Sequence, residues 1–181
     1  MPLANWQVDN THSSVGFTVR HMVVSKVHGR FAKWTATLAY DEDAPATSTV
    51  EVSIDTASID TGAGDRDAHL KSPDFFDVAK FPALTFKSTG VEVKGGNLKV
   101  TGDLTLHGVT KSVVLNVEHA SLGKDPWGNS RAGFSATTSI NRKEFGLAWN
   151  QALEAGGLLV SEKVEIGLEL QAIKPAAKTA T

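Results

Sequence analysis

The sequence has no cysteine, and this absence removes several kinds of chemistry from consideration. A chain without cysteine forms no disulfide, offers no thiolate nucleophile and builds no cysteine-based metal site. The sequence also lacks any run of the ~18 apolar residues that a membrane-spanning helix needs. Its N-terminal region has neither the basic nor the apolar part of a signal peptide. We therefore expect a soluble protein, cytoplasmic as written and periplasmic or secreted if the chain is a mature form.

An excess of charge of one sign is also missing. The 18 basic and 20 acidic residues are interspersed along the chain and give a net charge of -2. No cluster of basic residues is available to neutralise a phosphate backbone. We therefore expect no nucleic-acid partner.

The residue patterns of common active sites are absent as well. No serine stands in a strand–turn–helix elbow, and Gly62-x-Gly64 lacks the rest of a dinucleotide-binding fingerprint. No two histidines have the close spacing of a zinc motif; they stand at positions 12, 21, 28, 69, 107 and 119. We therefore expect no catalytic residues, no metal site and no cofactor.

Alternation of apolar and polar residues with a period of two is the dominant pattern. It recurs in about eight segments, mostly joined by hairpin-length loops such as residues 94–97 and 107–108. No long helical period separates these segments, which argues against parallel βαβ units. Closing such strands into a barrel removes exposed edges, so an eight-stranded antiparallel β-barrel is favoured over a two-sheet sandwich. We expect one domain over residues 1–174, with 175–181 a disordered tail and 22–28 a tight segment between strands.

One stretch, Asp60–Phe86, departs from this pattern. Gly62 and Gly64 end the preceding strand, Asp65 is a candidate N-cap for a short helix at residues 66–71, and Ser72-Pro73 resembles a second cap. Four phenylalanines follow within a dozen residues: Phe75, Phe76, Phe81 and Phe86. So apolar a loop must lie against other apolar groups, either as a plug at one end of the β-structure or as the lid of an apolar cavity.

Several inward positions on the strands are Gly, Ala or Thr, which leaves room for a ligand in an eight-stranded barrel. Gly102 is an example, since it stands mid-strand on an apolar face where glycine packs nothing, keeping space for a ligand or a close neighbour. The candidate apolar pocket consists of Phe17, Val19, Trp34, Leu38, Phe75, Phe76, Phe86, Gly102, Leu104, Phe134, Ile140 and Trp149. Arg20, Arg66, Arg142 and His12 are candidates to receive a polar or anionic head group.

Several longer motifs resemble one known family. They include W-x-V-D-x-x-H-S at residues 6–13, G-F-T-V-R-H-M at 16–22, R-D-x-H-L-K-S-P-D-F-F-D at 66–77 and G-F-S-A-T-T-S-I-N-R at 133–142. In order and spacing the sequence resembles the YceI-like, polyisoprenoid-binding family over residue 6 to about residue 172. The resemblance implies a lipocalin-like barrel that holds a long isoprenoid or similar amphiphile. It places the family's recurrent polar positions at His12, Arg66, His69, Arg142 and Trp149, as a polar mouth or scaffold cluster.

The sequence thus predicts a carrier or binding protein for a polyisoprenoid, an isoprenoid quinone or a similar long-chain fatty amphiphile. One alternative is an enzyme acting on such a molecule, which requires His12, Arg66 and His69 to converge. Another is an interaction or stress-response module with a packed interior. A homodimer stays open at this stage.

Overall fold

The computed structural model describes residues 4–22, 24–150 and 159–174, and most of these residues lie in β-strands. The strands are β1 Ala4–Val8, β2 Ser14–His21, β3 Ser25–Phe31, β4 Trp34–Tyr40, β5 Thr49–Asp55, β6 Ile59–Asp60, β7 Ala83–Lys94, β8 Asn97–Leu106, β9 Val109–Lys124, β10 Ser130–Asn141 and β11 Lys163–Lys174. The helical elements are α1 Gly64–Lys71 and the 3₁₀ turns η1 Asn10–His12, η2 Pro45–Thr47, η3 Thr56–Ser58 and η4 Arg142–Phe145. The tail expected at 175–181 lies outside the described residues.

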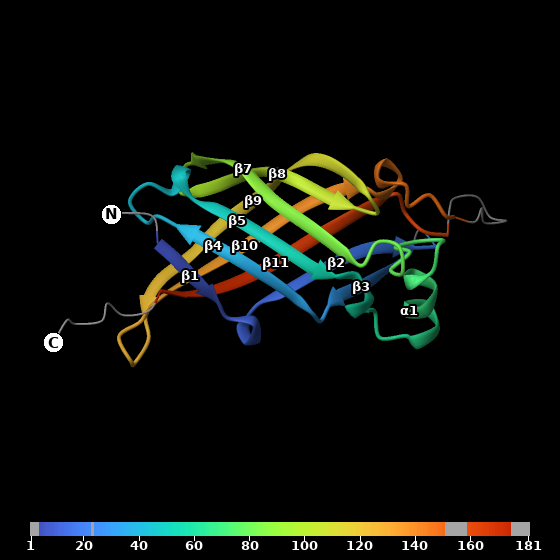
Figure 1. Ribbon diagram of the computed structural model, residues 1–181, viewed down its shortest axis with the longest axis horizontal. Helices are drawn as coiled ribbons and strands as arrows, with labels where there is room; N and C mark the ends of the chain where they lie inside the picture. The colour runs from blue at the N-terminus through green and yellow to red at the C-terminus, as the bar shows by residue number, and fades with distance from the viewer. Residues whose placement is uncertain (1–3, 23, 151–158, 175–181) are drawn as a thin grey trace.

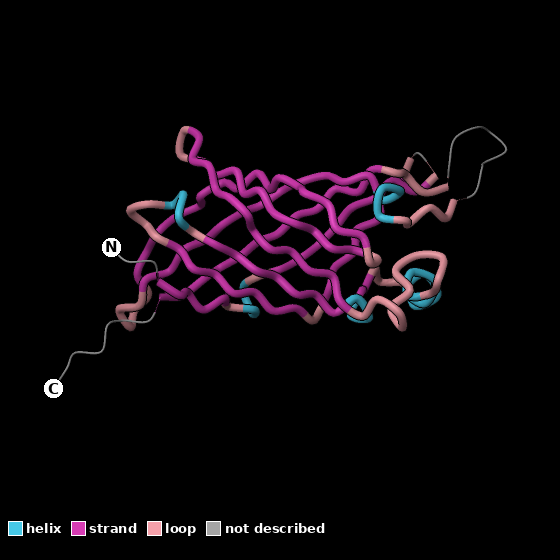
Figure 2. The backbone as a smooth tube through the Cα atoms, turned by 45° about the horizontal axis from the view of Figure 1, so that its top comes forward, coloured by secondary structure: helices cyan, strands magenta, loops and turns pink. Residues whose placement is uncertain are grey.

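The sheet closes on itself. Eight strands form a ring in the order β1-β4-β5-β7-β8-β9-β10-β11, and antiparallel pairing of β1 with β11 completes it. The predicted eight-stranded antiparallel barrel is therefore confirmed, and Figures 1 and 2 show its elongated shape. β2 pairs with the N-terminal half of β11, and β3 then pairs with β2. These two strands extend the barrel wall at the end where α1 lies (Figure 1).

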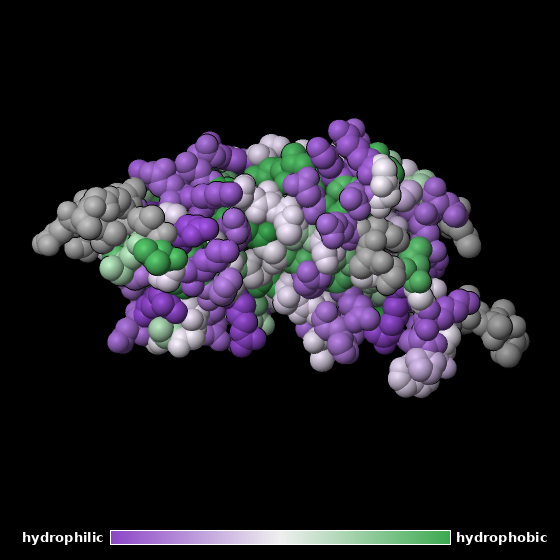
Figure 3. Space-filling model, turned by 180° about the vertical axis from the view of Figure 1, so that it is seen from behind, coloured by the Kyte–Doolittle hydropathy of each residue, from purple (hydrophilic) through white to green (hydrophobic). Residues whose placement is uncertain are grey.

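The alternation in the sequence explains why the barrel has one apolar and one polar face. In β8, Leu98, Val100 and Leu104 are buried while Lys99 and Asp103 are exposed. The outer surface is accordingly rich in hydrophilic side chains, with apolar groups interspersed (Figure 3). Across the described part of the chain, no helix combines the length and apolar character needed to cross a membrane.

β3 differs from the sequence-based expectation of a tight segment at residues 22–28. Residues 25–31 form a full strand that pairs with β2 from Gly16↔Arg30 to His21↔Ser25. Its pattern is hard to recognise because Gly29 stands at an inward position. The ring of Phe17 lies over that glycine, so close that an added Cβ would lie 2.2 Å from the ring. The neighbouring strand thus supplies the apolar group that β3 lacks.

The segment between β6 and β7, residues 61–82, is called the lid segment below. α1 is confirmed, but Asp65 does not cap it: the N-cap position is Ala63, without a side-chain hydrogen bond, and Asp65 lies in the first turn. The expected second cap at Ser72-Pro73 leads into turns and not into a helix. Backbone hydrogen bonds from Phe75 N to Ser72 O (3.0 Å) and from Phe76 N to Leu70 O (2.9 Å) hold these turns.

The structure explains the mid-strand glycine at position 102, and it corrects the expectation that Gly102 borders the ligand space. A Cβ at this position would lie 2.4 Å from the ring of Phe86 and 2.6 Å from the backbone oxygen of Lys87. Phe86, on β7, already covers the glycine, and Gly102 does not line the cavity described below.

We expect Gly102→Ala to lower the free energy of unfolding by about 1–3 kcal/mol, because the ring and the strand backbone must both shift. Gly167→Ala is the matched control, since Gly167 lies in β11 with nothing within 4 Å of an added Cβ. That control should be neutral or slightly stabilising. Urea unfolding of both variants measures the difference, and equal stabilities would contradict this account of Gly102.

Candidate functional site: an apolar cavity inside the barrel

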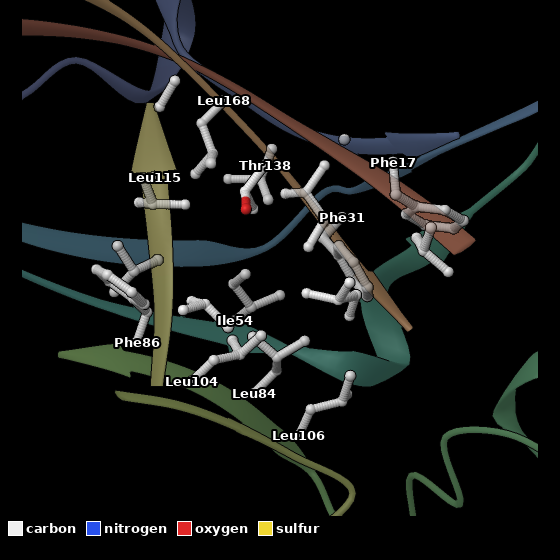
Figure 4. Close-up of a pocket in the computed structure, with 18 of the residues that line it drawn as sticks. Phe17, Phe31, Ile54, Leu84, Phe86, Leu104, Leu106, Leu115, Thr138 and Leu168 are labelled. Atoms are coloured by element: carbon white, nitrogen blue, oxygen red, sulfur yellow. The ribbon is translucent and has the colours of Figure 1, made fainter. Parts of the chain in front are cut away.

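The barrel interior is hollow. The cavity has a volume of ≈ 320 Å³. Figure 4 shows side chains from opposite walls, among them Phe17, Ile54, Leu104 and Leu168, facing this common space. The lining is almost wholly aliphatic and aromatic, because it consists of the inward residues of the alternating strands. A fully packed interior, one of the alternatives from the sequence, is therefore not what the structure shows.

Aromatic rings pack across the lumen at the end opposite α1. The rings of Trp6 and Tyr40 meet edge to face at 5.8 Å, and those of Tyr40 and Phe134 at 5.2 Å. Trp6 Nε1 also donates a hydrogen bond to the backbone oxygen of Tyr40 (3.2 Å). All three side chains are buried. They form a floor for the cavity at this end.

A second aromatic cluster lies at the end that carries the lid segment. The centroid of the His69 ring lies 4.7 Å from that of Trp149 and 5.1 Å from that of Phe75. The centroids of the Phe75 and Trp149 rings are 5.3 Å apart. Phe76 contacts Phe31 on β3 at 5.9 Å. Since these residues also line the cavity, the lid segment contributes directly to the cavity wall.

Arg142 is the buried charge of this end. Its side chain is only 3% exposed, and its guanidinium donates to the backbone oxygens of Ser161 (2.9 Å), Leu147 and Val160 (3.3 Å). Burial lowers the pKa of Arg142, an effect that the nearby Glu162 partly opposes, but an arginine keeps its proton in proteins. A permanent cation therefore borders an apolar space, held by carbonyl groups.

Arg66 and His69 belong to the same end but already have partners. Arg66 donates to the side-chain and backbone oxygens of Thr61, both at 2.7 Å, and His69 Nε2 lies 2.9 Å from a carboxylate oxygen of Asp74. Both contacts are within the lid segment, so both residues fix its shape. Each also lines the cavity.

The structure brings together most of the residues predicted for the site. The cavity is lined by Phe17, Val19, Leu38, Phe75, Phe76, Phe86, Leu104, Phe134, Ile140 and Trp149, together with Arg66, His69 and Arg142. Trp34 does not line it, although its side chain is buried in the core. Arg20 is exposed on the outside of β2.

His12 does not belong to the mouth, and its assignment there is wrong. It lies in η1, on the outside of the barrel where the chain passes from β1 to β2, with its side chain 63% exposed. Its Nδ1 lies 2.8 Å from a carboxylate oxygen of Asp9, and this hydrogen bond is the main cause that holds the pKa of Asp9 below its usual value. The role of His12 is thus local to this turn.

Other residues that were not predicted from the sequence also line the cavity. Phe31, Leu115, Thr138 and Leu168 all project into the lumen (Figure 4). Three of them stand on the apolar faces of recognised strands, so alternation alone could have found them. Phe31 follows Gly29 in the strand that the sequence analysis did not recognise.

A closed antiparallel barrel around an apolar lumen, with a helical segment at one mouth, is a lipocalin-like architecture. The family can also be named, because the model of the YceI-like domain matches residues 6–172. The chain belongs to this family.

Similar proteins agree with that assignment. A UPF0312 protein of Vibrio cholerae is 46% identical over 147 residues, which are 80% of this chain and 78% of the relative. The structure of BcnA from Burkholderia cenocepacia superposes with a TM-score of 0.81 at 26% identity, over 91% of this chain and 99% of its own. A polyisoprenoid-binding domain from Saccharophagus degradans superposes with a TM-score of 0.64, over 96% of this chain and 100% of its own. At 20% identity, this last likeness shows the shared fold alone.

Proposed function

We propose that the protein binds and carries a long-chain isoprenoid lipid or an isoprenoid quinone, with the tail inside the barrel. The observation that carries this proposal is the cavity, whose walls are apolar along the barrel. The charged and imidazole side chains among its lining residues lie at the end with the lid segment. They are His21, Arg66, His69 and Arg142. A molecule with a long apolar tail and one polar end matches this distribution.

Burial of the tail supplies the driving force. At ~0.8 kcal/mol per buried CH₂, each five-carbon isoprene unit gains about 4 kcal/mol as an upper bound. Ordering a flexible tail and losing its translational freedom reduce that gain. The polar end contributes orientation: Arg142 offers a cation beside the lumen, and a quinone oxygen or an anionic head group is a suitable acceptor.

An enzymatic role has less support. The catalytic alternative required His12 to converge with Arg66 and His69, and the structure places His12 outside the barrel. Arg66 and His69 bond within the lid segment. A binding function needs no further group, so we favour it over turnover of the same ligand.

Native mass spectrometry of the purified protein tests the proposal. We expect an adduct whose mass matches an isoprenoid lipid or quinone, released on denaturation and identified after extraction. Titration of the delipidated protein with a fluorescent isoprenoid should saturate at a fixed ratio. Absence of the adduct together with absence of saturable binding would refute the proposal.

The lid segment provides a second prediction, because its two adjacent phenylalanines differ in burial. Phe75 is 7% exposed and packs against His69 and Trp149, whereas Phe76 is only partly buried and faces the cavity. We expect Phe75→Ala to lower the free energy of unfolding of the delipidated protein by about 3 kcal/mol, because the Phe75 ring is buried against His69 and Trp149. In the delipidated protein, Phe76→Ala should lower the free energy of unfolding by less than Phe75→Ala does. In the loaded protein the loss for Phe76→Ala should be clearly larger than in the delipidated one, because weaker binding reduces stabilisation by the ligand.

Melting curves of both variants, delipidated and reloaded with the same isoprenoid, measure these effects. Phe145→Ala is the control, since Phe145 is buried but does not line the cavity, so its loss should be similar in the two states. If Phe76→Ala also destabilises both states equally, the lid segment is a plug that makes no contact with ligand.

A further inference from the structure

The β2–β3 hairpin presents apolar side chains to solvent at the rim of the cavity. Val24 is 84% exposed, the highest value among large apolar side chains in the described ranges, and Met22 is 50% exposed. The backbone N–H of Met22 donates to the oxygen of Leu159 (2.8 Å), and His21 pairs with Val160. Leu159, Val160 and His21 all line the cavity. The hairpin is therefore attached to the mouth.

The backbone at this tip is in a conformation that apolar residues rarely adopt. Met22 has a φ of 54°, in the left-handed region where glycine or asparagine is the usual choice. A polar turn residue would satisfy the same geometry with less strain and without exposing a large apolar side chain. Folding of the hairpin alone does not explain a methionine here.

The two strands below the tip carry like charges on directly opposite residues. Arg20 and Lys26 are cross-strand partners and both are exposed. Opposed like charges destabilise a strand pair, and no ion pair to either residue is found among the described side chains. Glu162 follows Ser161, whose backbone N–H donates to the backbone oxygen of Arg20. The Glu162 carboxylate, however, forms its ion pair with Lys143 (2.9 Å). Among the described side chains, the basic pair next to the apolar tip thus has no acidic partner.

Trp127, another strongly exposed apolar side chain, lacks this combination. Trp127 is 77% exposed on the β9–β10 loop, at the end opposite α1 (Figure 1). Near it, Arg131 is paired with Asp125 at 3.1 Å and with Asp9 at 3.5 Å, whereas Lys124 is exposed; this loop, however, contributes no residue to the lining of the cavity. Exposed apolar surface, unpaired basic charge and the cavity mouth coincide only at the β2–β3 hairpin, among the residues with described side chains. Apolar atoms beside hydrophilic ones are visible at this end in Figure 3.

We propose that the β2–β3 hairpin docks the cavity mouth onto the surface of an anionic lipid bilayer. Met22 and Val24 would enter the boundary between head groups and acyl chains, while lipid phosphates neutralise Arg20 and Lys26. This inference rests on the proposed lipid-carrier function, because docking places the opening where an isoprenoid enters or leaves. Two apolar side chains and two cations give weak and reversible attachment, as a carrier requires.

Co-sedimentation with vesicles tests the docking. The wild-type protein should bind vesicles of phosphatidylcholine with phosphatidylglycerol, bind pure phosphatidylcholine weakly, and be released by salt. Each basic residue near an anionic surface contributes about 1 kcal/mol, which corresponds to roughly a fivefold change in partitioning. The double variant Arg20→Ser/Lys26→Ser should therefore reduce partitioning into the vesicles about 25-fold. Val24→Asp should reduce it at least about tenfold.

Matched controls come from the hairpin at the opposite end of the barrel. Val93→Asp replaces a similarly apolar side chain, 49% exposed, and Lys94→Ser/Lys99→Ser removes the same net charge. Both should partition like the wild type. Binding to anionic vesicles that persists in the hairpin variants and disappears in Trp127→Ser would overturn the proposal, and so would equal binding to both vesicle types.

A parallel titration with a fluorescent isoprenoid in the absence of vesicles separates the two proposals. The hairpin variants should keep the wild-type affinity for the isoprenoid in solution. Loss of vesicle binding with retained isoprenoid binding supports docking. Retained isoprenoid binding without any vesicle binding by the wild type refutes docking and leaves the carrier function standing.

Discussion

Replacing Arg142 with alanine is expected to lower the free energy of unfolding by about 3–5 kcal/mol. The guanidinium is buried and donates to three backbone oxygens, those of Ser161, Leu147 and Val160. Val160 O keeps a second donor in Asn150 Nδ2 (2.7 Å), but the other two oxygens lose a charged partner. Each buried acceptor left without a donor costs about 1–3 kcal/mol.

The Arg142 side chain also links the residues that follow β10 to the residues that lead into β11. Arg142 directly follows β10. Its guanidinium donates to Leu147, five residues further along the chain, and to Ser161, just before β11. Arg142→Lys should recover only part of the loss, because a single ammonium group does not reproduce the planar fork of donors. Lys143→Ala, one position further and exposed, removes a surface ion pair with Glu162 and should cost under about 1 kcal/mol.

Urea unfolding of these three variants provides the measurement, with isoprenoid binding followed in those that fold. A loss for Arg142→Ala no larger than that for Lys143→Ala would show that the carbonyl groups find other donors. Arg142 would then serve the ligand alone. Loss of both stability and binding is the result that the geometry predicts.

Local rules predicted the elements whose structure depends on adjacent residues. Gly95 and Gly96 adopt positive φ between β7 and β8, as do His107 and Gly108 between β8 and β9, and both tight turns were read from the sequence. The single helical turn η4 at Arg142–Phe145 also depends on adjacent residues. Its N-cap is Asn141, whose side chain accepts from Lys143 N, and Gly146 ends it in the left-handed conformation.

Local rules failed where a distant strand decides the outcome. Alternation indicates that Gly102 faces inward, but it does not reveal that Phe86 from β7 occupies the space above it. The same applies to Gly29 under Phe17, which concealed β3. His12 illustrates a second limit, because sequence motifs do not show that the chain crosses between two strands on the outside of the barrel at that point.

The cavity itself has a related explanation. A period of two assigns side chains to the inner or outer face, and an eight-stranded barrel with small inward residues leaves space. Whether that space is filled depends on how far each inward side chain reaches across the lumen. The floor formed by Trp6, Tyr40 and Phe134 is filled, whereas the region around Thr138 is open. No local pattern in β10 distinguishes these two levels.

Thr138→Phe is expected to weaken isoprenoid binding by up to about a thousandfold. Thr138 projects into the lumen from β10, at the level of Leu115 and Leu168 (Figure 4). A phenyl ring there occupies space that we assign to about one isoprene unit of the tail. Excluding those five carbons forfeits about 4 kcal/mol as an upper bound, and each 1.4 kcal/mol corresponds to about a tenfold change in affinity. The added ring faces an existing space, so the free protein should lose little stability.

Thr137→Phe is the matched control, because the adjacent residue of the same strand is exposed on the outer face. It introduces the same ring without entering the lumen, and its affinity should equal that of the wild type. Titration with a fluorescent isoprenoid, alongside urea unfolding of both variants, separates blocked binding from misfolding. Wild-type affinity in a folded Thr138→Phe variant would show that the tail does not occupy the middle of the barrel, since the ring would then exclude nothing that the ligand uses.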